Sequence, residues 1–139
     1  MNVWMAASDG NMEAVKTFLA EGGDVNAKDE NGYTPLQAAV GYSHAELVVF
    51  LLQNGATVML GDNENDTPLH ACEKVEIAKI LLAHGAELNA RNADGRTPYD
   101  TAIEDEHEEL ISMYEALGAE KSDLVEGSDE EEDDEDMAE

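Results

Sequence analysis

Apolar residues recur along the chain in short runs whose spacing fits one face of an α-helix. Two runs show this most clearly: Leu47, Val48, Phe50, Leu51 and Leu52, and then Ile77, Ala78, Ile80, Leu81 and Leu82. Polar residues fill the positions between them. Because positions three and four residues apart lie on one side of a helix, each run predicts a helix with one buried face.

Two further patterns repeat at the same interval as these runs. Glycines follow the apolar runs with spacings of 33, 30 and 33 residues, at Gly22, Gly55, Gly85 and Gly118. Thr-Pro pairs at positions 34, 67 and 97 are spaced by 33 and 30 residues. Two independent patterns with one shared period indicate a repeat protein, in which each unit buries its apolar face against its neighbour.

The repeated residues also predict where helices begin and end. A threonine side chain can accept a hydrogen bond from a free N–H group at a helix start, and proline fits the next position. Glycine adopts the left-handed conformation that commonly ends a helix. Each Thr-Pro pair and the following glycine enclose room for two short helices. The polar segments after the glycines, DVNAKDENG, TVMLGDNEND and ELNARNADG, are rich in residues that favour tight turns.

The chain resembles the ankyrin repeat in the segments DENGYTPLQAA, DNENDTPLHAC and NADGRTPYDTA. The resemblance implies an all-α repeat solenoid of about four helix-turn-helix units with projecting β-turn fingers. The first unit, which contains VWMAASDGNMEAVKTFLAEGG, aligns with the second at a shift of 33 residues and is expected to be a diverged cap. The expected domain covers residues 1–119, with units at about 1–33, 34–66, 67–96 and 97–119.

Negative charge dominates the chain, with 33 acidic residues against 7 lysines and arginines. Residues 1–118 carry a net charge of −15 and residues 119–139 carry −11, including an unbroken acidic run over 129–136. Such a run offers no core, so residues 120–139 are expected to be a disordered acidic tail. The tail is either a solubility device or a mobile polyanion that shields a basic protein. Ser128 lies in an acidic context typical of kinase substrates and is a phosphorylation candidate.

Composition also limits location and class of partner. No apolar run is long enough to span a membrane, and no signal peptide precedes the first unit, so a cytoplasmic or nuclear protein is expected. The negative field disfavours direct contact with nucleic acid or an anionic membrane and favours a basic partner. The single cysteine, Cys72, aligns with Ala6, Ala39 and Ala102, which indicates a buried core residue rather than a reactive thiol.

No catalytic, metal or cofactor site is expected. The ankyrin resemblance implies that His70, in the TPLH motif, ties a helix start to neighbouring backbone. His70 and Cys72 are the wrong set to close a zinc site, and no glycine-rich phosphate loop follows a strand. The chain is therefore expected to be a monomeric, non-catalytic binding module.

The resemblance places partners on the concave face, formed by the finger tips and the first helices. Carried over by position, this surface comprises Trp4, Asp9, Glu30, Tyr33, Tyr42, Glu64, Asp66, Asp94, Arg96, Glu104 and Asp105. Acidic residues dominate it, and Tyr33 and Tyr42 add rigid aromatic area of the kind that anchors interfaces. Trp4 either caps the N-terminal core or contacts a partner.

One repeat is three residues short, and the shortening can be located. Thr34 to Gly55 and Thr97 to Gly118 each span 21 residues, whereas Thr67 to Gly85 spans 18. Alignment leaves no counterpart in the third unit for residues 40–42, which shortens its first helix. The deletion is either drift tolerated at a turn or a binding notch between Tyr42 on one side and Glu104 and Asp105 on the other.

These patterns favour an acidic escort, or chaperone, for a basic client. The chain resembles small eukaryotic ankyrin proteins that escort a newly made ribosomal protein, and also small single-module ankyrin proteins of fungi. A histone is the competing basic client. The alternative function is a regulatory adaptor or inhibitor that binds an enzyme or signalling partner through shape, because some ankyrin kinase inhibitors also have a shortened first helix.

Overall fold

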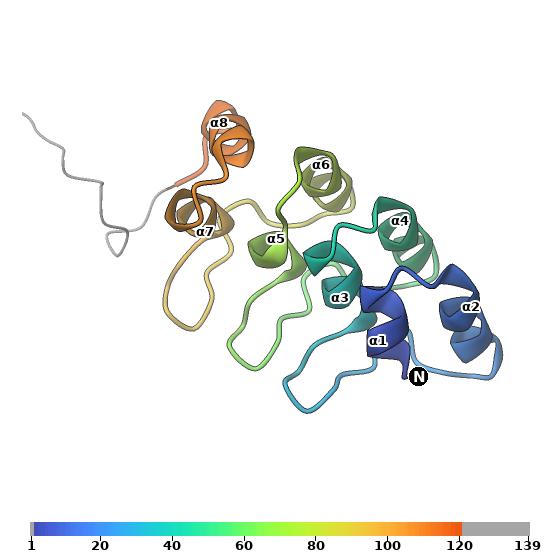
Figure 1. Ribbon diagram of the computed structural model, residues 1–139. Coiled ribbons are helices and arrows are strands. Elements are labelled where there is room, and N and C mark those ends of the chain that lie inside the picture. The colour runs from blue at the N-terminus through green and yellow to red at the C-terminus, as the bar shows by residue number, and fades with distance from the viewer. Residues whose placement is uncertain (1, 121–139) are drawn as a thin grey trace, which may run out of the picture.

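The computed structural model describes residues 2–120. Within this range the chain is entirely helical and contains no strand. The helices are α1 (Val3–Ser8), α2 (Met12–Ala20), α3 (Pro35–Gly41), α4 (Ala45–Gln53), α5 (Pro68–Ala71), α6 (Val75–Ala83), α7 (Pro98–Glu104) and α8 (Glu108–Ala116). They form four antiparallel pairs stacked side by side (Figure 1). The predicted all-α ankyrin-type solenoid is confirmed.

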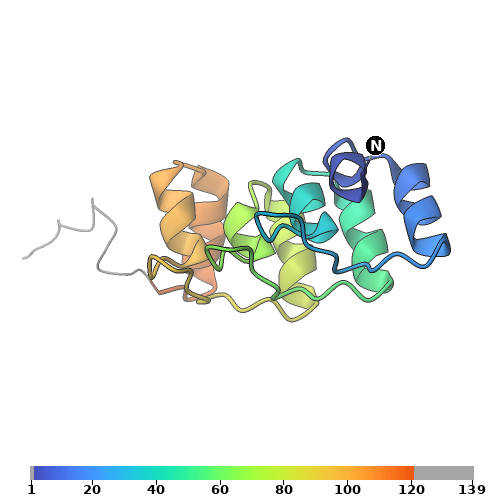
Figure 2. The ribbon, with the colours of Figure 1, turned by 90° about the horizontal axis from the view of Figure 1, so that it is seen from below.

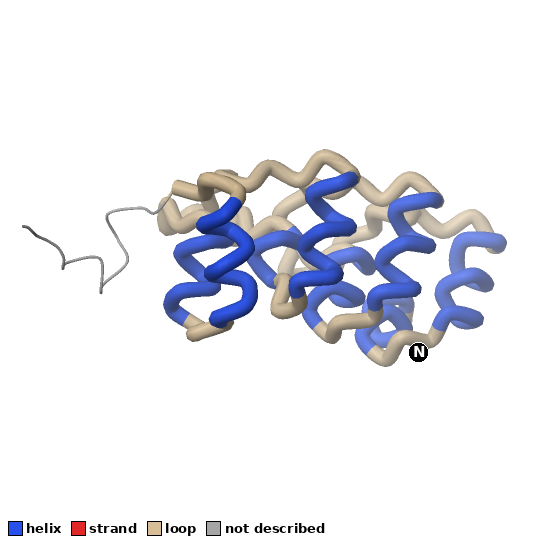
Figure 3. Tube along the Cα trace, turned by 90° about the horizontal axis from the view of Figure 1, so that it is seen from above, coloured by secondary structure: helices blue, strands red, loops and turns tan. Residues whose placement is uncertain are grey.

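The first helices of the pairs form one row and the second helices form another. Helices α1, α3, α5 and α7 lie beside the projecting fingers, whereas α2, α4, α6 and α8 form the opposite row (Figures 1 and 3). Seen from below, the fingers run side by side along the stack (Figure 2). The fingers and the first helices therefore share one elongated face.

The core runs continuously between the two rows of helices. Its largest fully buried side chains are Val15, Leu36, Val40, Leu47, Val48, Leu51, Leu69, Ile77, Leu81, Leu110 and Tyr114. The second helices contribute most of these residues, as the apolar runs predict. Cys72 is 4% exposed and belongs to the core, together with its repeat counterparts Ala6, Ala39 and Ala102. Its predicted structural role is confirmed.

Each Thr-Pro pair begins a first helix, as predicted. The threonine is the N-cap and the proline is the first helical residue in α3, α5 and α7. The glycines after the second helices all have positive φ, at 91°, 97°, 100° and 84° for Gly22, Gly55, Gly85 and Gly118. These left-handed residues end the helices without the steric cost that a Cβ atom would impose.

Side chains near the helix starts also link one unit to the next. In α3, the side chain of Gln37 accepts from Thr34 N at 3.1 Å and donates to the Asp66 carbonyl at 2.6 Å. In α5, His70 accepts from Thr67 N at 3.1 Å and its Nε2 lies 2.8 Å from the Arg96 carbonyl.

These bonds join each helix start to the residue that precedes the next helix start. Asp100 takes the corresponding position in α7 and accepts from Thr97 N at 2.8 Å.

The short repeat lies where the spacing predicts. Helix α5 has 4 residues, against 7 in α3 and 7 in α7. The turn that follows it is extended at Cys72 and Lys74, whereas the corresponding turns of the second and fourth units contain left-handed Ser43 and Glu106. The deletion therefore removes the last turn of the first helix and alters the path into the second.

A second set of bonds crosses between units at the bases of the fingers. Asn26 Oδ1 accepts from Thr57 N at 2.9 Å, and Asn89 Oδ1 accepts from Glu120 N at 2.8 Å. Met59 stands at the same repeat position, and its sulfur lies 3.2 Å from Glu87 N. A thioether is a weak acceptor, so the middle bond of this set is the poorest.

We expect Met59→Asn to stabilise the fold by about 1 kcal/mol, because a carboxamide oxygen replaces the thioether as acceptor for Glu87 N–H. Urea unfolding followed by far-UV circular dichroism measures the change. Met59→Leu is the matched control: it keeps the apolar volume, removes the acceptor and is expected to destabilise. A Met59→Asn variant less stable than the parent would show that the methionine contributes more through packing than the bond can.

Two kinds of feature are absent from residues 2–120. None of the helices in this range is long and apolar enough to cross a membrane. No group of three or more His, Cys, Asp or Glu side chains in this part of the chain is arranged to hold a metal ion.

Candidate functional site

A groove of about 360 Å³ opens on the face shared by the fingers and the first helices. Helix α1 contributes Trp4 and Ser8, and α3 with its C-cap contributes Gln37, Ala38, Gly41 and Tyr42. The first two fingers contribute Asp29, Tyr33, Asp62 and Asp66, and Ala71 at the end of α5 completes the lining. Four predicted partner-binding residues are thus brought together: Trp4, Tyr33, Tyr42 and Asp66.

Three aromatic side chains form part of the groove wall. Tyr42 is 66% exposed and Tyr33 is 44% exposed, so neither ring is committed to the core. Trp4 is half-buried, and its Nε1 donates to the Ala27 carbonyl at 3.0 Å. The indole therefore ties α1 to the first finger and also lines the groove.

The acidic wall of the groove comes from the turns of the fingers. Asp29 Oδ1 accepts from the N–H groups of Asn31 and Tyr33, each at 2.9 Å. Asp62 Oδ1 accepts in the same way from Glu64 and Asp66, at 2.8 and 3.0 Å. These bonds shape each finger and fix one carboxylate at the base of its turn.

In the third finger, Asn92 takes the place of these aspartates. Its Oδ1 accepts from Asp94 N and Arg96 N, each at 3.0 Å. The turn therefore requires a side-chain oxygen but no charge.

The groove is strongly negative around Tyr33. Burial raises the pKa of the Tyr33 hydroxyl, and the carboxylates of Asp62, Glu64, Asp66 and Asp29 raise it further, in that order. Negative groups on two fingers therefore act on a single ring. An electric field of this sign favours a cation in the groove.

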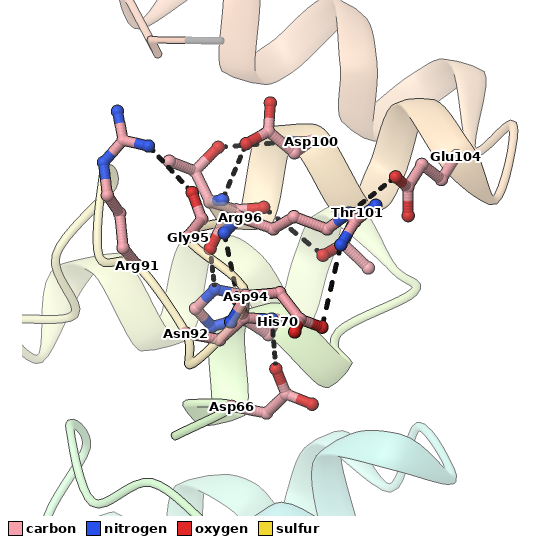
Figure 4. A network of polar contacts seen from close by, with 11 residues as sticks. Asp66, His70, Arg91, Asn92, Asp94, Gly95, Arg96, Asp100, Thr101 and Glu104 are labelled. Atoms are coloured by element: carbon pink, nitrogen blue, oxygen red, sulfur yellow. Dashed lines mark hydrogen bonds and ion pairs between the residues drawn. The ribbon is translucent and has the colours of Figure 1, made fainter. Parts of the chain in front are cut away.

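A second group of predicted residues forms its own ion-pair cluster farther along the stack (Figure 4). Arg96 Nε contacts Glu104 Oε2 at 2.6 Å, and its Nη1 lies 3.6 Å from Asp94 Oδ2. The hydrogen bond to Glu104 raises the pKa of Arg96, and the negative charge of Glu104 raises it further. Glu104 thus pairs with Arg96 and does not line the groove that contains Tyr42.

The remaining predicted residues neither line the groove nor belong to the ion-pair cluster, although the charge of Glu64 acts on Tyr33. Asp9 and Asp105 are exposed C-cap residues of α1 and α7, and Glu30 and Glu64 are exposed on the fingers. The groove is lined by Tyr42 but by neither Glu104 nor Asp105, so the alternative of a notch between them stays a prediction. Ser128 and the tail over 121–139 lie outside the described residues.

Sequence reasoning missed Asp29 and Asp62 as groove residues. Both begin the D-x-x-G or D-x-x-N turn of a finger, where an aspartate is expected to stabilise the turn rather than bind a partner. Their repetition at one position, with Asn92 as the uncharged version, was the available signal. Their position beside the aromatic rings depends on how the fingers fold back over the first helices.

His44, His70 and the cysteine have structural roles. His44 Nε2 lies 2.7 Å from the Ser8 carbonyl, and His70 bridges two units as described above. Burial raises the pKa of Cys72 to about 11, so this thiol stays protonated at neutral pH and is a poor nucleophile. None of these groups forms a nucleophile–base pair in the described part of the chain.

The sequence pattern of ankyrin repeats matches residues 3–92 in three copies. An ankyrin repeat-containing protein of Schizosaccharomyces pombe is 44% identical over 95 residues, which are 68% of this chain and 46% of that protein. The chain is an ankyrin-repeat protein. It is also 31% identical over 115 residues to a tyrosine-protein kinase of Hydra vulgaris, and 38% identical over 103 residues to the ankyrin repeat and SOCS box protein 11 of Mus musculus.

The chain spans less than half the length of each of these relatives. It covers 46% of the fission yeast protein, 15% of the Hydra kinase and 31% of the mouse protein. What is shared is therefore the repeat stack. Ankyrin repeats form protein–protein interaction modules and are typically non-catalytic, which assigns this ankyrin-repeat protein to the class of binding modules.

Proposed function

We propose that this ankyrin-repeat protein escorts a basic protein client, gripping a segment of it on the face shared by the fingers and first helices. A newly made ribosomal protein is the preferred class of client and a histone is the second. Both classes occur in the cytoplasm and the nucleus. The observation that carries the proposal is the groove itself, where aromatic rings and acidic side chains stand together.

Charge supports the same proposal over a longer range. Residues 1–118 carry 21 acidic residues against 6 basic residues. A field of this size speeds the encounter with a basic protein and repels nucleic acid that would compete for it. The sequence over 119–139 adds a net charge of −11, which in the proposed mechanism masks the client's lysines and arginines until hand-over.

The escort proposal predicts steep salt dependence. We expect the affinity for purified ribosomal proteins or histones to fall at least tenfold between about 0.05 M and about 0.5 M salt, because screening weakens charge attraction. Isothermal titration calorimetry measures the affinity. Light scattering of the client with and without the chain measures its protection from aggregation.

A truncated chain separates the contribution of the tail. The deletion should remove 121–139 and keep Glu120, because Glu120 N bonds to Asn89 and its carbonyl accepts from Thr97 at 3.2 Å. A chain with an uncharged segment of equal length in place of 121–139 is the matched control. Both variants are expected to protect the client less well. An affinity that is insensitive to salt and to the tail would contradict the escort proposal and favour the regulatory adaptor.

A further inference from the structure

Within residues 2–120, no lysine or arginine forms an ion pair with the carboxylates of the groove. In residues 2–120, the only lysine or arginine that forms an ion pair is Arg96, which contacts Asp94 and Glu104 outside the groove. Lys28, beside the first finger, donates instead to the Gly61 carbonyl at 3.2 Å. In this part of the chain, the negative charge of Asp29, Asp62 and Asp66 is therefore not neutralised by a paired side-chain cation and can attract one from a partner.

Burial makes part of this charge more effective. Asp62 is only 9% exposed and is fixed by the two N–H groups that it accepts. Asp66 Oδ1 is fixed by Asn92 Nδ2 at 2.8 Å. Charges held at a partly desolvated wall attract a cation more strongly than mobile charges in water, and little ordering is needed when the cation binds.

The aromatic side chains supply the second half of a cation site. Tyr33 and Tyr42 are substantially exposed, and Trp4 lines the same groove. An aromatic face attracts a cation, and tryptophan and tyrosine do so most strongly. Ser8, Ala38 and Ala71 also line the groove and contribute only small side chains.

We propose that this groove binds an arginine side chain presented by an extended segment of the client. The inference rests on the proposed function for the basic character of the partner and adds the residue that is recognised. A guanidinium is planar, so it can stack on a ring while its several N–H groups point to carboxylates, whereas an ammonium offers a single strongly hydrated charge. A volume of about 360 Å³ accommodates such a side chain with part of its neighbours.

The chain itself indicates a clean variant for the test. Asn92 forms the third finger turn with the same two N–H bonds that Asp29 and Asp62 accept. The double variant Asp29→Asn/Asp62→Asn is therefore expected to keep the finger turns while removing two charges from the groove. Glu46→Gln/Glu108→Gln is the matched control, since both residues are exposed in the first turns of α4 and α8 and neither lines the groove.

The probe is a short fluorescein-labelled peptide with arginine among glycine and serine residues, and the full chain is used. Fluorescence anisotropy measures its affinity, and the emission of Trp4, the single tryptophan, reports occupation of the groove. The groove variant is expected to bind about tenfold more weakly than the parent, and the control variant within about twofold. Tyr42→Ala is expected to weaken binding as well. A matched peptide with lysine is expected to bind more weakly than the arginine peptide. A matched peptide with uncharged citrulline is expected to show no detectable binding.

Three results would overturn the assignment. Equal affinity of the groove variant and its charge-matched control would place the arginine elsewhere on the acidic surface. Equal affinity for lysine and arginine peptides would remove the guanidinium preference. No response of anisotropy or Trp4 emission at millimolar arginine peptide would exclude the site. In each case, salt-dependent binding of an intact basic client would still support the escort proposal, so the two failures can be told apart.

Discussion

Replacing His70 by alanine is expected to lower the free energy of unfolding by about 3 kcal/mol. His70 is 5% exposed, and its ring connects Thr67 N to the Arg96 carbonyl. Alanine leaves the buried Thr67 N–H without its acceptor, removes the bond to the next unit and opens a cavity. The lost bond lies in the middle of a stack in which each unit contacts only its neighbours, so the two halves should also become less tightly coupled.

Glutamine at the same position separates the hydrogen bonds from the ring. Gln37 makes the equivalent pair of bonds one unit earlier, so His70→Gln is expected to stay within about 1 kcal/mol of the parent. Urea unfolding followed by far-UV circular dichroism measures both variants. If glutamine is as damaging as alanine, packing of the imidazole and not the link between units is what His70 contributes.

The fold was predictable because the same signals for helix starts and ends recur in successive repeats of the sequence. Thr34, Thr67 and Thr97 each gave the same helix start, and the glycines gave the helix ends. The position of the deletion in the third unit was also predictable, because the Thr-Pro pair and the glycine of that unit lie on either side of the missing residues. Helix α5 has 4 residues as a result.

The candidate site was only partly predictable, because spacing gives register and not distance between side chains. The repeat register places Tyr33, Tyr42 and Glu104 on one face. In the structure the two tyrosines line the groove, whereas Glu104 forms an ion pair with Arg96. The choice depends on side-chain reach: an arginine at a finger end can reach along its own unit to α7. Asp62 belongs to the site because the second finger and Trp4 line the same groove, which repeat spacing alone does not reveal.

A side chain larger than its repeat counterparts lies near the end of the shortened helix. Tyr114 in α8 stands at the repeat position that Leu81 and Leu51 hold in the preceding units. Tyr114 is fully buried, and burial raises the pKa of its hydroxyl. Cys72, just beyond α5, lies close enough to raise this pKa further. Val40, which is buried in α3, has no counterpart in α5. We infer that the tyrosine ring fills the space that the missing turn leaves.

Tyr114→Ala is therefore expected to cost about 4 kcal/mol, because it opens a large cavity near α5, the shortest of the described helices. Two further variants identify what the side chain does. Tyr114→Phe is expected to be neutral or up to about 1 kcal/mol stabilising, because the buried hydroxyl has no hydrogen-bond partner in the described structure. Tyr114→Leu is expected to lose about 2 kcal/mol, although leucine fills the same position in two other units.

Urea unfolding gives these values, and the rate at which Cys72 reacts with a thiol reagent in native buffer reports opening of the same region. A leucine variant as stable as the parent, with Cys72 equally protected, would show that the space beside α5 is of ordinary size. The short repeat would then need no compensation from its neighbour, and the tyrosine would be an ordinary core substitution.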